Sequence, residues 1–145
     1  KKFGCTHVIN YSKEDFQKKV MEITNEEGLP VVYDGVGKVT MEKSLGCLKM
    51  RGTFVSFGNA SGKLDPLDVG KLIAPKGLFL TRPSIAHYTA TRKELDEAAD
   101  KLFEMVKTQK VKIDIFKKYG LKDAVNAHKD LEGRKIIGPA IIVPN

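Results

Sequence analysis

Two short apolar runs each end in residues suited to contact a nucleotide. Residues 31–37 read V-V-Y-D-G-V-G, and residues 54–59 read F-V-S-F-G-N. A helical pattern lies between them, as in a parallel sheet whose strands are joined by helices. Ligands of such sheets sit at the carboxyl ends of the strands. The pattern therefore predicts a nucleotide-binding site at Asp34–Gly37 and at the turn that begins with Phe57.

The turn after the first run leaves several roles open. Asp34 could be a catalytic acid or base, could bind a ribose hydroxyl, or could cap the following helix, and capping is the favoured reading. Gly35 and Gly37 form a G-x-G, but position 40 is Thr, so the dinucleotide fingerprint G-x-G-x-x-G is incomplete. A tight turn is favoured for this pair. Glycine also allows the backbone to approach a ligand closely.

Neither metal-binding nor nucleophilic chemistry is indicated. His7, His87 and His128 lack the spacing of metal ligands, and Cys5 and Cys47 lack a C-x-x-C partner. A G-x-S-x-G elbow is also missing from the sequence. Two isolated cysteines fit a reduced compartment, so a cytoplasmic location is expected.

Composition bounds the class of protein. With 145 residues and 41% hydrophobic residues, the chain has the length of one domain and can bury a core. Lys+Arg 25 against Asp+Glu 18 leaves a net charge of +7. The lysines occur in ones and twos without interleaved aromatic residues, so a solvated surface is favoured over a nucleic-acid partner. No apolar stretch reaches the roughly 20 residues that span a bilayer, and no membrane partner is expected.

Strands and helices alternate along the chain, which predicts one α/β domain with a parallel sheet and right-handed crossovers. The apolar face of the longest helix, at Leu95, Ala98, Ala99, Leu102, Phe103 and Val106, is expected to face inward, and Thr91 and Glu94 form its capping box. The expected strands are Thr6 to Tyr11, Leu29 to Tyr33, Thr53 to Phe57, Leu78 to Thr81 and Ile136 to Val143. The expected helices are one around Phe16 to Ile23, then Thr40 to Met50, Val69 to Ala74, Thr91 to Lys107 and Leu121 to Leu131.

Five segments in this order resemble a known family. They are Val8 to Tyr11, Val31 to Gly37, Val55 to Gly62, Thr81 to Ser84 and Ala127 to Glu132. Over essentially all 145 residues, the chain resembles the C-terminal part of zinc-independent NADPH:quinone oxidoreductases of the medium-chain dehydrogenase/reductase superfamily. The resemblance implies a partial Rossmann-like parallel sheet with flanking helices, followed by a C-terminal segment. The family's first two strands, its glycine-rich phosphate loop and its GroES-like catalytic domain would lie upstream of Lys1.

The resemblance also implies NADPH as cofactor and assigns contacts to it. Tyr11 matches the tyrosine that approaches the 2′-phosphate, and Gly35 matches a position beside the adenosine part. Phe57 and Gly58 match a pair that lines the cofactor near the nicotinamide.

Four further contacts follow from the same resemblance. Leu80, Thr81 and Arg82 match the edge of the next strand against the nicotinamide, and Arg134 matches a late arginine that reaches the cofactor from the C-terminal segment. Reducing equivalents come from NADPH in such enzymes, so no side chain of this segment is assigned to catalysis and none to a metal.

The implied partners are a quinone substrate and a second copy of the chain, paired through the edge strand at Leu78 to Thr81. The protein is therefore expected to be an NADPH:quinone reductase, while these residues alone are expected to be inactive. The alternatives are a dimerisation and partial nucleotide-binding fragment without turnover, and a related enoyl reductase or alcohol dehydrogenase. A basic nucleic-acid binder is the least favoured reading.

Overall fold

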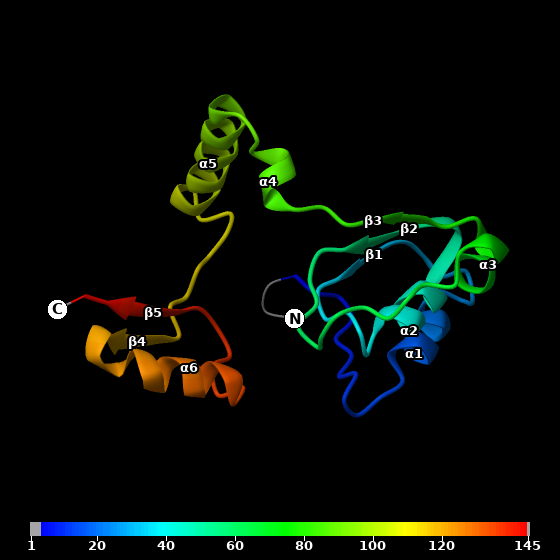
Figure 1. Cartoon of the computed structure of the whole chain (residues 1–145), viewed down its shortest axis with the longest axis horizontal. Helices are drawn as coiled ribbons and strands as arrows, with labels where there is room; N and C mark the ends of the chain where they lie inside the picture. The colour runs from blue at the N-terminus through cyan, green and yellow to red at the C-terminus, as the bar shows by residue number, and fades with distance from the viewer. Residues whose placement is uncertain (1–3, 145) are drawn as a thin grey trace. The chain divides into compact units, whose positions relative to one another are not determined.

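The computed structural model describes residues 4–144, so Lys1 lies outside the described residues. The chain divides into two compact units, residues 1–87 and residues 88–145, which are described separately (Figure 1). The expected partition into a partial nucleotide-binding domain and a C-terminal segment stays a prediction. No helix in the described part of the chain combines the length and the apolar character needed to cross a membrane.

A three-stranded parallel sheet organises the first unit, as the sequence predicts. Its strands are β1 (Leu29–Asp34), β2 (Leu48–Ser56) and β3 (Phe79–Thr81), in the order β1-β2-β3. Asp34 pairs with Ser56 across the first ladder, and Val55 pairs with Thr81 across the second. Because the strands are parallel, their carboxyl ends meet at one edge of the sheet (Figure 1).

Short helices connect these strands and enclose the core. The buried core cluster comes from α2, β2 and the residue before β3, and its members are Met41, Leu45, Leu48, Phe54 and Leu78. The helical elements of this unit are α1 (Phe16–Ile23), α2 (Met41–Gly46), α3 (Val69–Leu72), the 3-10 helix η1 (Ala74–Lys76) and α4 (Ile85–Tyr88), which reaches the unit boundary.

The strand predicted at Thr6 to Tyr11 is wrong, because residues 7–10 have no regular secondary structure and Tyr11 begins a turn. The segment was expected to be the third strand of a doubly wound sheet, and in the strand order of such a sheet the third strand bonds to the second. The sheet described in this unit contains only β1, β2 and β3, so the segment has no neighbouring strand to complete its hydrogen bonds. Apolar alternation alone is not sufficient to make a strand.

The helix predicted at Thr40 to Met50 is also too long. The observed helix α2 ends at Gly46, and β2 begins at Leu48 rather than at Thr53. Glycine is a poor helix former, and Leu48 pairs with Leu29 of the neighbouring strand. Tertiary pairing therefore overrides the helical spacing of Leu45 and Leu48.

The second unit contains a two-stranded parallel sheet, β4 (Lys117–Gly120) and β5 (Ala140–Val143). The connection between these strands carries the 3-10 helix η2 (Leu121–Asp123) and helix α6 (Ala124–Glu132). The predicted helix at Leu121 to Leu131 is thereby confirmed, and the strand predicted at Ile136 to Val143 is shortened to its second half.

Helix α5 (Arg92–Lys107) confirms the longest predicted helix and its capping box at Thr91 and Glu94. The expected burial of its apolar face is wrong within the described residues: Leu102 is 51% exposed and Phe103 is 67% exposed. Amphipathic spacing identifies the face that a helix can bury, but it does not identify the element that covers this face.

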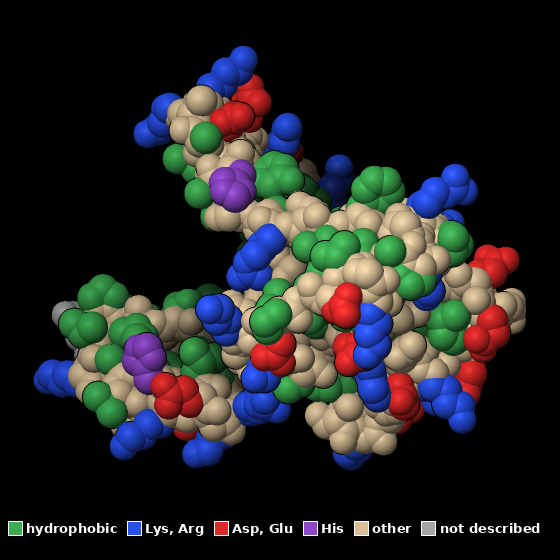
Figure 2. Space-filling view, turned by 45° about the vertical axis from the view of Figure 1, so that its right-hand side comes forward, with side chains coloured by type: hydrophobic (Ala, Val, Ile, Leu, Met, Phe, Trp, Pro, Cys, Tyr) green, Lys and Arg blue, Asp and Glu red, His purple; other side chains and the backbone are tan. Residues whose placement is uncertain are grey.

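Basic side chains are dispersed over the surface. Figure 2 shows lysine and arginine side chains interspersed with acidic ones on the visible face of the first unit rather than gathered into one patch. Several form exposed ion pairs within this unit, such as Lys38 with Asp65 and Lys43 with Asp15. This arrangement supports the solvated-surface interpretation of the net charge.

Candidate functional site

The carboxyl ends of the three parallel strands are tied to one another. The backbone N–H of Phe57, just after β2, donates to the carbonyl oxygen of Asp34 at the end of β1 over 3.0 Å. On the other side, Nη1 of Arg82, just after β3, donates to the hydroxyl oxygen of Ser56 over 3.0 Å. The structure thus brings four of the eight predicted residues, Gly35, Phe57, Gly58 and Arg82, to one edge of the sheet.

Two glycines allow the first two strand ends to touch. A side-chain carbon on Gly58 would lie 2.7 Å from the carbonyl oxygen of Gly35 and 3.0 Å from its α-carbon. These distances are shorter than any van der Waals contact between such atoms, so only glycine fits at position 58 without a backbone shift. Gly35 and Gly58, which were both predicted to contact a cofactor, therefore also allow the two strand ends to approach each other.

Phe57 covers the turn after β1. A side-chain carbon on Gly35 would lie 2.9 Å from Cζ of the Phe57 ring, so the ring occupies the space that the missing side chain leaves open. The ring is nevertheless 59% exposed. An exposed aromatic ring above a glycine backbone is a surface on which a flat heteroaromatic group can stack.

The loop after β2 is fastened to the turn after β1. The backbone N–H groups of Ala60 and Ser61 donate to the carbonyl oxygens of Gly35 and Val36 over 3.2 and 2.8 Å. The Ser61 hydroxyl donates to the same Val36 oxygen over 2.7 Å and accepts from the backbone N–H of Val39 over 3.1 Å. Sequence reasoning did not identify Ser61, because its partners are more than 20 residues away.

Asp34 is an internal support of the turn. It is 5% exposed, and its Oδ1 accepts from the backbone N–H groups of Val36 and Gly37 over 2.8 and 2.9 Å. Its Oδ2 accepts from the hydroxyls of Thr40 and Ser44 over 2.8 and 2.7 Å. The expected capping role of Asp34 is wrong, because α2 begins after Thr40 and its first turn has no side-chain cap, whereas the backbone N–H groups bound by Asp34 lie in the turn before the helix. Thr40 and Ser44 could have been found, since residues four apart share one face of a helix.

The carboxyl of Asp34 is held in its charged form. Burial alone would raise its pKa, but the hydrogen bonds from Gly37, Ser44, Thr40 and Val36 outweigh burial and lower the pKa below its usual value. A carboxylate that accepts several hydrogen bonds is favoured over its protonated form. Asp34 is thus poorly suited to donate or accept a proton during a reaction at neutral pH.

Tyr11 and Gly35 line one cavity of about 290 Å³ in the first unit. Tyr11 is 47% exposed. Aromatic, aliphatic and hydroxyl side chains from the N-terminal segment, α1, β1 and α2 complete the walls. Besides Tyr11 and Gly35, they are His7, Ile9, Phe16, Val20, Tyr33, Asp34, Val36, Thr40 and Ser44.

The other predicted residues are distributed as follows. Leu80 and Thr81 lie in β3 and are both exposed, with Leu80 at 48%. Arg134 lies in the second unit, in the turn after α6, with a left-handed φ of 55°. Their predicted contacts with a cofactor stay predictions.

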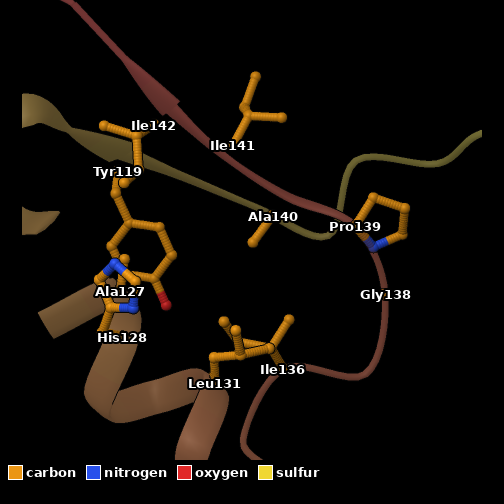
Figure 3. Close-up of a pocket in the computed structure, with 10 residues that line it drawn as sticks. All are labelled: Tyr119, Ala127, His128, Leu131, Ile136, Gly138, Pro139, Ala140, Ile141 and Ile142. Carbon is orange, nitrogen blue, oxygen red and sulfur yellow. The ribbon is translucent and has the colours of Figure 1, made fainter. Parts of the chain in front are cut away.

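A second cavity, of about 310 Å³, lies in the second unit between α6 and the β4–β5 sheet (Figure 3). The ring of Tyr119 and the side chain of Leu131 face it, and His128 stands at its α6 side. None of the eight predicted residues lines this cavity. Its walls are mainly apolar.

The described residues do not offer a metal site. They contain no group of three or more His, Cys, Asp or Glu side chains that could hold an ion. Cys47 is 2% exposed, and burial raises the pKa of its thiol to about 11, so it is a packing residue. The donor set that zinc requires is therefore not provided by residues 4–144.

Comparisons with known proteins identify the family of this chain. The family model described as zinc-binding dehydrogenase matches residues 3–142. A 2-haloacrylate reductase from a Burkholderia species and quinone oxidoreductase 1 of Escherichia coli (strain K12) are each 43% identical over 145 residues, 99% of this chain and 44% of each relative. The chain thus spans less than half the length of these curated relatives.

Solved structures of similar proteins share the fold of this chain. The crystal structure of Escherichia coli quinone oxidoreductase complexed with NADPH superimposes with a TM-score of 0.92 at 43% identity, covering 97% of this chain and 44% of that one. The crystal structure of a 2-haloacrylate reductase superimposes with a TM-score of 0.87, also at 43% identity, covering 99% of this chain and 45% of that one. By its sequence and its Rossmann-like parallel fold, this chain belongs to the zinc-binding dehydrogenase family.

Proposed function

We propose that this chain forms part of the cofactor site of an NADPH-dependent quinone oxidoreductase. The observation that carries the proposal is the contact between Gly35 and Gly58, which joins the carboxyl ends of β1 and β2 beside the exposed Phe57 ring. The similarity to an Escherichia coli quinone oxidoreductase crystallised with NADPH supports it. Because the chain matches 44% of that protein, the proposed activity is that of the natural-length protein and not of these residues alone.

The residues at this edge fit a dinucleotide. The Phe57 ring fills the space beside Gly35, and because this ring is itself exposed it offers a face on which a base can stack. Tyr11 is half-exposed and lines the same cavity as Gly35, and its hydroxyl would suit a phosphate oxygen. Arg82 is a cation fixed by Ser56 at the third strand end and would attract the anionic cofactor.

NADPH would supply the reducing equivalents when bound. The residues of this chain would bind and orient it: Tyr11 at the 2′-phosphate, Gly35 beside the adenosine, and Phe57 and Gly58 toward the nicotinamide. The strand edge at Leu80–Arg82 would support the nicotinamide, and an exposed aromatic surface would exclude water from it. None of these roles requires a nucleophile or a metal ligand.

The cofactor preference can be tested at Tyr11. In the protein at its natural length, Tyr11→Phe removes only the hydroxyl and should raise the KM for NADPH about fivefold, the order expected for one lost hydrogen bond. The KM for NADH should not change. The matched control is Tyr88→Phe, since Tyr88 is also an exposed tyrosine, on α4. No quinone-dependent oxidation of NADPH by the unsubstituted protein would contradict the proposed function.

Reduction of an activated carbon–carbon double bond is the second candidate function. The curated 2-haloacrylate reductase is as similar to this chain as quinone oxidoreductase 1 is, at 43% identity. Assays of the natural-length protein with NADPH and either 1,4-benzoquinone or 2-chloroacrylate separate the two candidates, and oxidation of ethanol by NADP⁺ tests for an alcohol dehydrogenase. The proposal predicts the highest kcat/KM for the quinone, and a higher value for 2-chloroacrylate would favour the second candidate.

A homodimer through β3 is part of the proposal. Within the described sheet β3 is an edge strand, and its Phe79 is 61% exposed. Exposed apolar edge strands need to be paired or covered. Phe79→Lys should convert a dimer to a monomer in analytical ultracentrifugation. Val69→Lys, at an equally exposed position of α3, should leave the dimer intact, and a monomeric unsubstituted protein would contradict this part.

Zinc-independence and a cytoplasmic location complete the proposal. The resemblance of residues 55–62 to the quinone reductases supports the first, and two free cysteines support the second. Quinone reduction by the natural-length protein should therefore be unchanged after dialysis against EDTA. Loss of activity that added Zn²⁺ restores would contradict zinc-independence.

A further inference from the structure

A buried polar network supports the turn that carries Gly35. Asp34, Thr40 and Ser44 are each 5% exposed. They come from the end of β1, the residue before α2 and the middle of α2. The Thr40 hydroxyl lies 3.0 and 2.8 Å from the two Asp34 carboxylate oxygens, and the Ser44 hydroxyl lies 2.7 Å from one of them. A buried carboxylate is tolerated only where such donors satisfy it.

The same carboxylate determines the path of the turn. It accepts the backbone N–H groups of Val36 and Gly37, and Gly37 has a left-handed φ of 89°. A side-chain carbon on Gly37 would lie 3.0 Å from the α-carbon of Asn59. The turn is therefore held between the Asp34 carboxylate on one side and the loop after β2 on the other.

We infer that Asp34, through Thr40 and Ser44, is a positioning residue that fixes the turn 35–37 for binding of the adenosine part of the cofactor. This inference rests on the proposed function. Four donors within the protein, two backbone N–H groups and the hydroxyls of Thr40 and Ser44, use the roughly four acceptor sites of the Asp34 carboxylate, so it is assigned no hydrogen bond to the cofactor. It acts through the turn itself, because its carboxylate binds the backbone N–H groups of Val36 and Gly37, the two residues that follow Gly35.

The sharpest test is at Thr40, because two substitutions there differ mainly in the hydroxyl. Thr40→Val keeps the shape of the side chain and removes the donor, whereas Thr40→Ser keeps the donor. In the natural-length protein, Thr40→Val should raise the KM for NADPH and the Kd for adenosine 2′,5′-bisphosphate about fivefold. Thr40→Ser should stay within about twofold of the unsubstituted protein, and the KM for the quinone should not change in either variant.

A stability control separates positioning from folding. Ile73→Val removes one methyl group beside the core cluster and leaves the turn untouched. All variants are assayed well below their unfolding temperatures. If the role of Thr40 is merely structural, Thr40→Val and Ile73→Val will both lower the Tm and leave the KM for NADPH unchanged, which would overturn the inference.

Asp34→Asn and Asp34→Ala test the carboxylate itself. The amide oxygen can still accept from Val36 and Gly37, whereas Asp34→Ala removes every acceptor. The Kd for adenosine 2′,5′-bisphosphate should be lowest for the unsubstituted protein, higher for Asp34→Asn and highest for Asp34→Ala. Equal Kd values for the three folded proteins would overturn the inference alone. No binding of NADPH to the unsubstituted protein would overturn the proposed function, and the inference with it.

Discussion

The carbonyl oxygen of Gly35 lies 2.7 Å from the position that a side-chain carbon on Gly58 would occupy. These residues follow two neighbouring parallel strands, so their contact joins the turn after β1 to the loop after β2. The exposed Phe57 ring is held by the same arrangement. The candidate site therefore depends on the spacing of two backbone segments more than on any one polar side chain.

Gly58→Ala is expected to damage both stability and cofactor binding. The added methyl group meets backbone atoms of Gly35 that cannot rotate away, and overpacking of this kind costs about 1–3 kcal/mol of unfolding free energy. Urea unfolding measures this loss. Gly70→Ala, where the nearest atom lies at 3.4 Å in the side chain of Asp68, should be nearly neutral. Equal stability of the two variants would contradict the close contact.

Lys76→Met is expected to destabilise the end of α2. The Lys76 ammonium donates to the carbonyl oxygens of Gly46 and Leu48 over 2.9 and 2.5 Å. Methionine keeps an apolar stem of similar length but no donor, so about 1–2 kcal/mol of unfolding free energy should be lost. Lys71→Met on α3 is the exposed control. A loss as large in Lys71→Met would show that the two carbonyl contacts are unimportant.

The two cysteines should react at very different rates. Cys5 is exposed, whereas Cys47 is 2% exposed, and burial raises the pKa of its thiol to about 11. Only the thiolate is nucleophilic. Iodoacetamide should therefore modify Cys5 in the native protein, and Cys47 only in urea, as peptide mass spectrometry can resolve. Rapid native labelling of Cys47 in the Cys5→Ser variant would contradict the described core.

Acid should destabilise the second unit through Asp130. The hydrogen bonds from Lys117 and Tyr119 lower the pKa of this carboxyl from 3.8 to about 2. A lowered folded-state pKa contributes stability that is present above pH 3.8 and is lost as the pH falls toward about 2. Tyr119→Phe and Asp130→Asn should both flatten this loss in urea unfolding. Tyr88→Phe should not, and an unchanged pH profile in Asp130→Asn would refute the assignment.

Local signals in the sequence were sufficient for most elements. The capping residues Thr91 and Glu94 correctly predict where α5 begins, because capping depends only on neighbours along the chain. The strand at Leu29 is predicted despite Pro30, and the ladder register shifts at this proline. The parallel arrangement follows from the alternation of strands and helices.

Elements that depend on distant partners were not predictable in the same way. The segment at Thr6 has the composition of a strand but lacks a neighbouring strand, and Leu48 joins a strand because it pairs with Leu29. The contact of Arg82 with Ser56 joins residues 26 positions apart, and that of Ser61 with Val36 joins residues 25 apart. Spacing along the chain carries no information on such contacts.

A crystal structure of the natural-length protein grown with NADPH tests the central proposal most directly. The dinucleotide should lie along the carboxyl ends of β1 and β2, in van der Waals contact with Gly35, Phe57 and Gly58, and with its 2′-phosphate within hydrogen-bonding distance of Tyr11. A cofactor bound elsewhere, with these four residues bare at saturating NADPH, would contradict it.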